Sequence, residues 1–482
     1  MQAARIFLIF LIAIVTGPFL AISHAAAQNP PRPNIVYILA DDLGWKDVGF
    51  HGSDIKTPNI DRLAQGGAQL EQFYAQPMCT PTRAAVMTGR YPFRYGLQTL
   101  VIPSSMDYGL PTDERLLPVA LKSAGYKTAI IGKWHLGHGQ RKFWPMERGF
   151  DYQYGALLGE IDYYKHSVGG VRDWFRNEKP VNEAGYVTTL LGEDAVRFID
   201  GQSAAQPFFL YLAFTAPHSP YQVPQKYLDM YPGITDANRR AYAAMITAMD
   251  EQIGNVVSAL EKRGLRDNTI IIFHSDNGGN RAAHLAGESE VKGELPADNG
   301  PYRGGKGDLY EGGTRVASLI NWPAKIKAGT RVDGVMHVVD YYPTLIKLAG
   351  GSLDQPKPLD GIDMWPVIGE GAPSPRQEVV YNIEMFRGAV RQGDWKLFWR
   401  ATLPSRIELY DLSQDPGEKN NLAEQNPDKV RDLQKRIGVL SGEMAKSLLL
   451  ESLFKTISKQ LVGQPPKLPN DDAFYEQSVT GD

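Results

Sequence analysis

Four apolar runs constrain the fold of this chain more than any other feature. Each is continuously apolar rather than alternating, and they span 35–40, 128–131, 208–214 and 269–273. Such runs are typical of strands that helices cover on both faces of a parallel sheet. Helical patterns lie between them, such as the apolar stripe over 238–262. The alternation predicts an α/β fold with a mostly parallel central sheet flanked by helices.

The pattern changes after about residue 375. Short strand-like runs separated by turn residues follow there, at 379–383, 388–391, 395–399 and 407–412. Closely spaced short strands predict an antiparallel sheet, and an amphipathic stretch over 427–445 predicts a helix beside it. With 482 residues, the chain is long enough for a large domain and a smaller one. We therefore expect a large domain over 28–375, a small C-terminal α+β domain over 376–446, and a tail over 447–482 that the sequence leaves unassigned.

Residues 1–27 have the layout of a secretory signal peptide. Arg5 precedes an apolar run over 6–15, and Ala25-Ala26-Ala27 offers a small-residue cleavage site. A membrane anchor is the alternative, but a run of ten residues is shorter than the roughly 20 that a spanning helix needs. The mature protein is therefore expected to be exported, periplasmic or secreted, with no membrane span.

Composition excludes several classes of function. The chain has one cysteine, Cys79, which excludes an intramolecular disulfide framework and a multi-cysteine zinc site. Its formal net charge of −3 gives no sign of the basic excess typical of nucleic-acid binders.

Unusual polar residues follow each of the four buried runs. Asp41-Asp42 follow the first, Lys133 and His135 the second, His218 the third and Asp276-Asn277 the fourth. In open α/β sheets, ligands bind in a crevice at the carboxyl ends of the strands. The sequence therefore predicts that these four strand ends contribute to one site.

The polar residues divide into an acidic set and a cationic set. Three carboxylates and one amide form an all-oxygen set, which suits a hard cation such as Ca²⁺ or Mg²⁺ better than zinc. Taken alone, an Asp-Asp pair is usually a solvated turn and a single histidine a structural hydrogen-bonding residue. Together with a metal, several cations indicate an anionic tetrahedral group, and sulfate and phosphate esters both fit. The cationic set is Arg83, Lys133, His135, His218 and Lys306.

Proline marks two helix starts. Thr57 stands before Pro58, so we expect Thr57 to cap a helix that begins there. Cys79 stands two residues before Pro81, and a helix-favouring run over 84–87 follows. Cys79 is therefore expected at a helix N-terminus, where backbone N–H groups and the helix dipole favour an anion and would stabilise a thiolate.

Six motifs, in order along 32–425, resemble the type I sulfatase family. Cys79-Thr80-Pro81-Thr82-Arg83 is similar to its signature Cys-X-Pro-Ser-Arg, with threonine where serine is usual. The other five motifs lie at 40–44, 125–135, 275–279, 305–315 and 408–422. Trp45 to Gly52, Gln98 and 162–164 add a likeness to the arylsulfatase B, or N-acetylgalactosamine-4-sulfatase, branch. The resemblance implies an alkaline-phosphatase-like large domain.

The resemblance also implies a cofactor and a mechanism. Cys79 would be converted by a formylglycine-generating enzyme to formylglycine (3-oxoalanine), whose hydrate attacks the ester sulfur. Arg83 and Lys133 would hold the hydrate, His135 would take its second proton, and His218 and Lys306 would contact the sulfate. The implied Ca²⁺ ligands are Asp41, Asp42, Asp276, Asn277 and the modified Cys79.

The residues alone leave two other functions open. A phosphatase or phosphodiesterase of the alkaline-phosphatase-like superfamily would use a serine or threonine nucleophile and two metals, whereas the sequence offers ligands for one. A non-catalytic binder of sulfated glycans would have lost catalytic residues, and none of the expected set is missing. The branch likeness suggests 4-sulfated N-acetylgalactosamine of chondroitin or dermatan as substrate, with aryl sulfates as surrogates.

Overall fold

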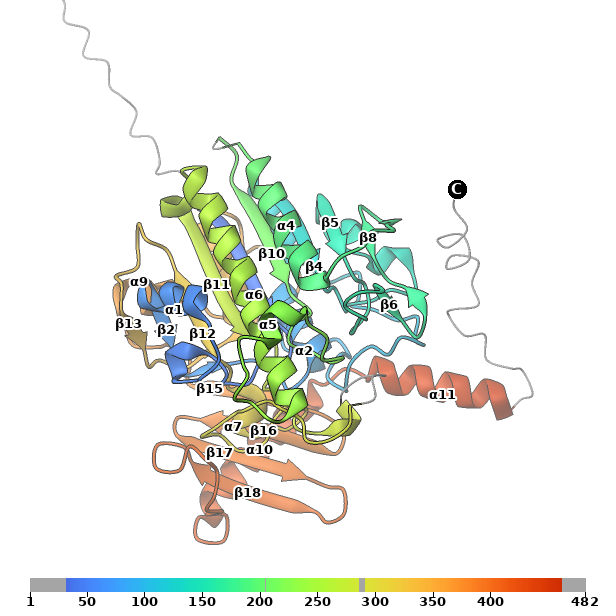
Figure 1. Cartoon of the computed structure of the whole chain (residues 1–482). Helices are drawn as coiled ribbons and strands as arrows, with labels where there is room; N and C mark the ends of the chain where they lie inside the picture. The colour runs from blue at the N-terminus through green and yellow to red at the C-terminus, as the bar shows by residue number, and fades with distance from the viewer. Residues whose placement is uncertain (1–31, 204, 286–290, 462–482) are drawn as a thin grey trace, which may run out of the picture. The chain divides into compact units, whose positions relative to one another are not determined.

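A ten-stranded mixed sheet forms the centre of the fold (Figure 1). The computed structural model describes residues 32–203, 205–285 and 291–461. The strand order is β13-β2-β12-β11-β1-β10-β4-β5-β8-β9. The central strands run parallel and are β11 (Thr269–Ser275), β1 (Asn34–Ala40), β10 (Phe208–Ala213), β4 (Lys127–Gly132) and β5 (Tyr152–Gly155). The flanking strands are β12 (Ser318–Asn321), β2 (Ala68–Leu70), β13 (Thr330–Val332), β8 (Phe175–Arg176) and β9 (Lys179–Pro180).

The predicted parallel centre is confirmed, and the packing explains the continuous apolar runs. Successive side chains of a strand point to opposite faces, and both faces of β1 are covered. Tyr37 and Leu39 belong to one hydrophobic core, whereas Val36 and Ile38 belong to the other. Every residue of β1 is therefore buried.

Helices cover the two faces in separate groups. One core includes residues of α2 (Cys79–Thr88), α3 (Leu117–Ser123) and α8 (Tyr341–Leu348). The other includes residues of α1 (Pro58–Gln65), α4 (Val187–Asp200) and α6 (Ala237–Lys262), and α4 and α6 lie side by side (Figure 1). The remaining short strands and α-helices of this region are β3 (Phe73–Tyr74), β6 (Ser167–Val168), β7 (Val171–Arg172), α5 (Gln225–Leu228), α7 (Glu311–Thr314), β14 (Met336–His337) and α9 (Trp365–Glu370).

The predicted antiparallel sheet near the C-terminus is also confirmed. Its strands pair in sequence order and are β15 (Glu378–Ile383), β16 (Arg387–Gln392), β17 (Trp395–Arg400) and β18 (Arg406–Asp411). The amphipathic helix α10 (Pro427–Gly442) packs on this sheet. Val390 and Leu433 belong to the same hydrophobic core as one face of the large sheet, so the two sheets share buried apolar surface.

The two ends of the chain hold the predicted signal peptide and the unassigned tail. The predicted signal peptide lies outside the described residues. Part of the unassigned tail forms a further helix, α11 (Leu448–Leu461). Among the residues that the structure describes, no helix is long and apolar enough to cross a membrane.

Candidate active site

Four neighbouring parallel strands, β11, β1, β10 and β4, end at one edge of the large sheet. Asp276 and Asn277 follow β11, Asp41 and Asp42 follow β1, His218 follows β10, and Lys133 and His135 follow β4. The structure therefore brings together the residues that the sequence analysis placed at separate strand ends. The N-terminus of α2 and a loop that carries Lys306 complete the site.

Acidic groups gather at the centre of this edge. Asp41, Asp42, Cys79 and Asp276 each offer one ligand atom, and these atoms lie within 4.8 Å of one another. Burial and the charge of Asp41 raise the pKa of Asp276. Burial acts on Asp41 in the same direction, but Lys133, His218 and Arg83 outweigh it and lower the pKa of Asp41. Buried carboxylates this close repel each other unless a cation or a proton lies between them.

Asn277 adds an unsatisfied oxygen to the acidic group. Its Nδ2 donates to Asp42 Oδ1 at 2.8 Å, whereas its buried Oδ1 has no hydrogen-bond partner among the described residues. A buried polar atom without a partner is rare, and ligation of an ion is one of its standard explanations. Carboxylate and amide oxygens are the ligands that Ca²⁺ and Mg²⁺ prefer. The residues present therefore fit a hard divalent cation.

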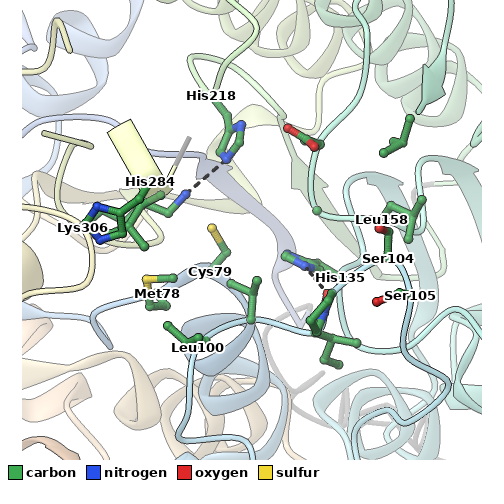
Figure 2. Close-up of a pocket in the computed structure, with 17 residues that line it drawn as sticks. Met78, Cys79, Leu100, Ser104, Ser105, His135, Leu158, His218, His284 and Lys306 are labelled. Atoms are coloured by element: carbon green, nitrogen blue, oxygen red, sulfur yellow. Dashed lines mark hydrogen bonds between the residues drawn. The ribbon is translucent and has the colours of Figure 1, made fainter. Parts of the chain in front are cut away.

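Three buried cations contact these carboxylates. Lys133 Nζ lies 2.6 Å from Asp41 Oδ2, and Arg83 Nη2 lies 2.9 Å from Asp276 Oδ2. Lys306 Nζ lies 2.9 Å from Asp42 Oδ2 and 3.2 Å from His218 Nε2, and Figure 2 shows this lysine and histidine facing the space above Cys79. The arrangement places positive charge on both sides of the acidic group, where an anionic ester would bind.

Cys79 is the first residue of α2, as predicted, and is 1% exposed. Its Sγ lies 3.4 Å from Asp41 Oδ1. The expected stabilisation of a thiolate is wrong, because burial and the charge of Asp276 raise the pKa of the thiol well above its ordinary value. The helix N-terminus does not overcome a dry, acidic environment, so the unmodified thiol is neutral and a poor nucleophile.

His135 is held as a neutral imidazole. Burial, together with Lys133 and Arg83, lowers its pKa well below the ordinary value. Its Nε2 lies 3.1 Å from the carbonyl oxygen of Ile102, which can only accept, so Nε2 carries the proton. Its buried Nδ1 has no hydrogen-bond partner in the described parts of the chain. His135 therefore presents an unprotonated nitrogen that can accept a proton.

A cavity of about 380 Å³ opens above Cys79 (Figure 2). Cys79, His135, His218 and Lys306 line its base. Its walls were not predicted from the sequence; they are mostly apolar and come from connecting segments and from β6. They include Met78, 100–105, 158–160, Val168, His284 and Leu285. His166 is close in sequence to Val168 but does not itself line the cavity. It is buried, stacks on Trp174 and bonds to the carbonyl oxygen of Gly185.

A buried charge cluster holds the segment that carries Lys306. Glu311 Oε1 lies 3.0 Å from Lys396 Nζ, which lies 2.7 Å from Glu418 Oε1. Tyr74 and Tyr381 donate their hydroxyls to Glu311, each at 2.7 Å. Lys396 and Glu418 did not emerge from the sequence analysis, although a lysine inside the apolar run 395–399 was a signal that could have found Lys396.

The backbone of the same segment touches the acidic group. Gly278, next to Asn277, donates its N–H to the carbonyl oxygen of Gly313 at 2.9 Å. A Cβ at Gly278 would stand 1.8 Å from the carbonyl oxygen of Gly312, so only glycine allows this approach. The segment therefore links the acidic group, Lys306 and the C-terminal sheet.

Known proteins share both the sequence and the fold. The Sulfatase family model matches residues 33–352, and the model for the C-terminal region of N-sulphoglucosamine sulphohydrolase matches residues 305–442. Arylsulfatase J of Mus musculus is 38% identical over 409 residues, which cover 82% of this chain and 66% of that protein. N-acetylgalactosamine-6-sulfatase of Mus musculus is 36% identical over 373 residues, covering 73% of this chain and 69% of that protein. The chain thus spans about two thirds of the length of these two relatives.

A solved structure agrees over most of the chain. The crystal structure of Ps i-CgsB in complex with k-i-k-neocarrahexaose is similar with a TM-score of 0.80 at 33% identity, covering 90% of this chain and 98% of that one. The family model, the curated relatives and this structure all point to one conclusion. The chain belongs to the sulfatase family, the enzymes that hydrolyse sulfuric esters.

Proposed function

We propose that this protein hydrolyses a sulfated sugar or an aryl sulfate through a formylglycine residue made from Cys79. The observation that carries the proposal is the place of Cys79, at the base of the cavity and within the group of three carboxylates. A neutral, buried thiol is a poor nucleophile, whereas the hydrate of an aldehyde offers two hydroxyl groups at the same point. One hydroxyl attacks, and the other restores the aldehyde.

The neighbouring side chains suit the two steps. One hydroxyl gives its proton to one of the neighbouring carboxylates, whose oxygens lie within 4.8 Å of the Cys79 position, and forms a bond to sulfur. The bond from sulfur to the alcohol then breaks, and His218 or Lys306 supplies the proton that the alcohol takes away. The second hydroxyl then gives its proton to His135 Nδ1, the bond from carbon to the sulfate oxygen breaks, and inorganic sulfate leaves. Arg83 and Lys133 hold the hydrate, because both face the carboxylates around Cys79.

Asp41, Asp42, Asp276, Asn277 and the modified side chain at position 79 would hold a Ca²⁺ ion. When bound, the ion would polarise a sulfate oxygen and neutralise the three carboxylates. The unsatisfied Oδ1 of Asn277 supports this assignment. Mg²⁺ offers the same charge but demands a stricter octahedral geometry.

The substrate proposal is narrower than the family. The likeness to the arylsulfatase B branch favours 4-sulfated N-acetylgalactosamine of chondroitin or dermatan. The relatives named above support a sulfated sugar more broadly, since one is named for N-acetylgalactosamine 6-sulfate and another was crystallised with a neocarrahexaose. The protein would meet this substrate after export to the periplasm or medium, with a formylglycine-generating enzyme as its partner in maturation.

The test compares an aryl sulfate with the matching aryl phosphate. The protein is coexpressed with the formylglycine-generating enzyme, and mass spectrometry of the peptide around residue 79 measures conversion. We expect sulfate release that disappears in Cys79→Ala and in protein treated with EGTA, and that returns when Ca²⁺ is added to the treated wild type. Phosphate release that survives in Cys79→Ala would overturn the proposal and support a phosphatase.

A further inference from the structure

A second cavity adjoins the one above Cys79. It also has a volume of about 380 Å³, and Glu160 and Val168 line both cavities. Whatever fills the first cavity therefore reaches the second by passing these two residues. The other residues that line the second cavity are Ile161, Asp162, Lys165, Ser167, Gly169, Gly170, Pro220 and Gln222.

Val168, which lines both cavities, belongs to a short β-hairpin. Strands β6 and β7 pair with each other, and Gly169 and Gly170 form the turn with positive φ angles of 53° and 84°. Asp162 donates its backbone N–H to the carbonyl oxygen of Ser167 at 2.9 Å, which ties the base of the hairpin. A Cβ built at Gly170 meets no atom within 4 Å, so the turn borders open space. The hairpin therefore contributes Val168 to both cavities, and its turn leaves the second cavity open.

Hydrogen bonds orient two polar side chains that line the second cavity, Asp162 and Gln222. Asp162 Oδ1 accepts the backbone N–H groups of Tyr164 at 3.0 Å and Lys165 at 2.7 Å. Asp162 Oδ2 accepts from Gln222 Nε2 at 3.1 Å, and Gln222 Oε1 accepts the backbone N–H of Tyr163 at 2.8 Å. These bonds fix which end of the Gln222 amide faces which partner, and one hydrogen on its nitrogen makes no bond to any residue that the structure describes.

Two further polar groups around this cavity are available. The ammonium of Lys165 is exposed, and neither it nor the hydroxyl of Ser167 makes a hydrogen bond or ion pair with any described residue. Lysine offers three donors, and serine offers one donor and two acceptors. The first cavity, in contrast, is walled by Leu100, Leu158 and other apolar side chains. A ligand that spans both would be apolar-faced in the first and rich in hydroxyl groups in the second.

We propose that the second cavity is a subsite for a further saccharide unit, joined to the sulfated unit that occupies the first cavity. The assignment rests on the proposed function and extends it to a substrate of at least two sugar units. The C–H face of the sulfated sugar packs on the apolar walls. Hydroxyl oxygens of the next unit accept hydrogen bonds from Lys165 and Gln222, and Ser167 donates to or accepts from a third hydroxyl. An aryl sulfate fills the first cavity only.

The test uses the full-length, formylglycine-containing enzyme on four substrates: an aryl sulfate, a sulfated monosaccharide, and that monosaccharide extended by one unsulfated unit at either end. The variants are Lys165→Ala, Ser167→Ala and the double variant, and Arg197→Ala on the exposed face of α4 is the matched control. In the wild type we expect one of the two extended substrates to gain about tenfold in kcat/KM over the monosaccharide. The double variant should lose that gain while its aryl sulfate turnover stays within about twofold of the wild type.

Several outcomes would overturn the subsite. They are no gain from extension at either end in the wild type, or a gain that the double variant and Arg197→Ala retain equally. Failure of the proposed function is distinguishable, because it removes aryl sulfate turnover from every protein. In that case, calorimetric titration of Cys79→Ala with the extended substrates still tests the subsite. Adding Lys165→Ala to that variant should weaken the binding of one extended substrate at least fivefold, and unchanged binding would overturn the subsite.

Discussion

Asp42 and His135 are held in left-handed backbone conformations, with φ angles of 65° and 56°. Such conformations are uncommon for residues other than glycine and are concentrated at functional sites, where the surrounding structure holds them. Asp42 lies two residues beyond the end of β1 and His135 three residues beyond the end of β4, so the backbone turns soon after it leaves the sheet. The turn aims Asp42 at Lys306 and leaves His135 Nδ1 unpartnered among the described residues. The sequence predicted which residues follow the strands, but not these conformations.

Thr82 occupies the position where the sulfatase signature usually has serine, and the structure shows what its hydroxyl does. Thr82 Oγ1 accepts the backbone N–H of Gln76 at 2.9 Å and lies 3.1 Å from the carbonyl oxygen of the same residue. Thr82→Ser retains the hydroxyl, so we expect little change in stability. Thr82→Val should lower the free energy of unfolding by about 1–3 kcal/mol, because it leaves the buried backbone of Gln76 unpaired. Urea denaturation measures the stability of both variants. Equal stability of Thr82→Ser and Thr82→Val would contradict a role for the hydroxyl in holding the backbone of Gln76.

Helix α1 begins where the sequence predicted, but its capping residue is different. The side chain of Thr57 makes no capping hydrogen bond. Asp250 of α6 instead accepts the backbone N–H groups of Asn59 at 3.0 Å and Ile60 at 2.8 Å. Proline at the first helical position is a local signal, whereas a cap from a residue 191 positions away depends on how α1 and α6 pack. Local signals therefore locate the helix, and only the fold identifies the partner.

This cap makes stability depend on pH. Burial raises the pKa of Asp250 to about 6, above its ordinary value of 3.8. The folded state therefore holds the proton more tightly, and this stabilisation is full below about pH 4 and lost as pH rises through about 6. Relative to Asp250→Asn, the wild type should lose about 1–3 kcal/mol of unfolding free energy between pH 4 and pH 7. Denaturant titrations at pH 4 and pH 7 measure the unfolding free energies, and Asp432→Asn, at an exposed position, is the control. The same difference between wild type and Asp250→Asn at both pH values would contradict the prediction.

At the scale of the whole molecule, the Glu311–Lys396–Glu418 cluster connects the C-terminal sheet to the segment that carries Lys306. All three side chains are fully buried. Arg303 of the same segment also donates to the hydroxyl of Tyr410 at 2.9 Å. Removing one partner of a buried ion pair leaves uncompensated charge and typically costs about 3–5 kcal/mol. These contacts link the C-terminal sheet to the segment that carries Lys306.

Lys396→Met should therefore lower the melting temperature and also raise KM for an aryl sulfate, because Lys306 loses its support. The double variant Lys396→Met/Glu418→Gln should recover part of both losses, since one of the two uncompensated carboxylates is gone. Thermal unfolding and steady-state kinetics measure the two effects. A fall in melting temperature with KM unchanged would show that the cluster stabilises the fold without positioning Lys306.

The sequence predicted the centre of the molecule better than its periphery, for physical reasons. The central strands are buried on both faces, so their apolar runs are continuous and easy to identify. Short edge strands such as β8 and β9, with two residues each, have no such pattern. Strand-end residues such as Asp41 and Asp276 follow from the topology of a parallel sheet. The cavity walls at 100–105 and 158–160 do not, since connecting segments take their positions from tertiary packing.

The division between strand ends and connecting segments also has an evolutionary meaning. Most of the groups proposed to act on the sulfate ester follow the central strands or lie on α2, and Lys306 lies on a loop that the buried charge cluster holds. A substitution at these positions would disturb buried ion pairs. The groups that would touch the rest of the substrate sit on loops and on the β6–β7 hairpin, which can change length and composition at little cost to the core. Descendants of one ancestral enzyme can therefore acquire new substrates by loop exchange while inheriting the same chemistry. Relatives named for an aryl sulfate and for N-acetylgalactosamine 6-sulfate are the outcome that such a division of labour predicts.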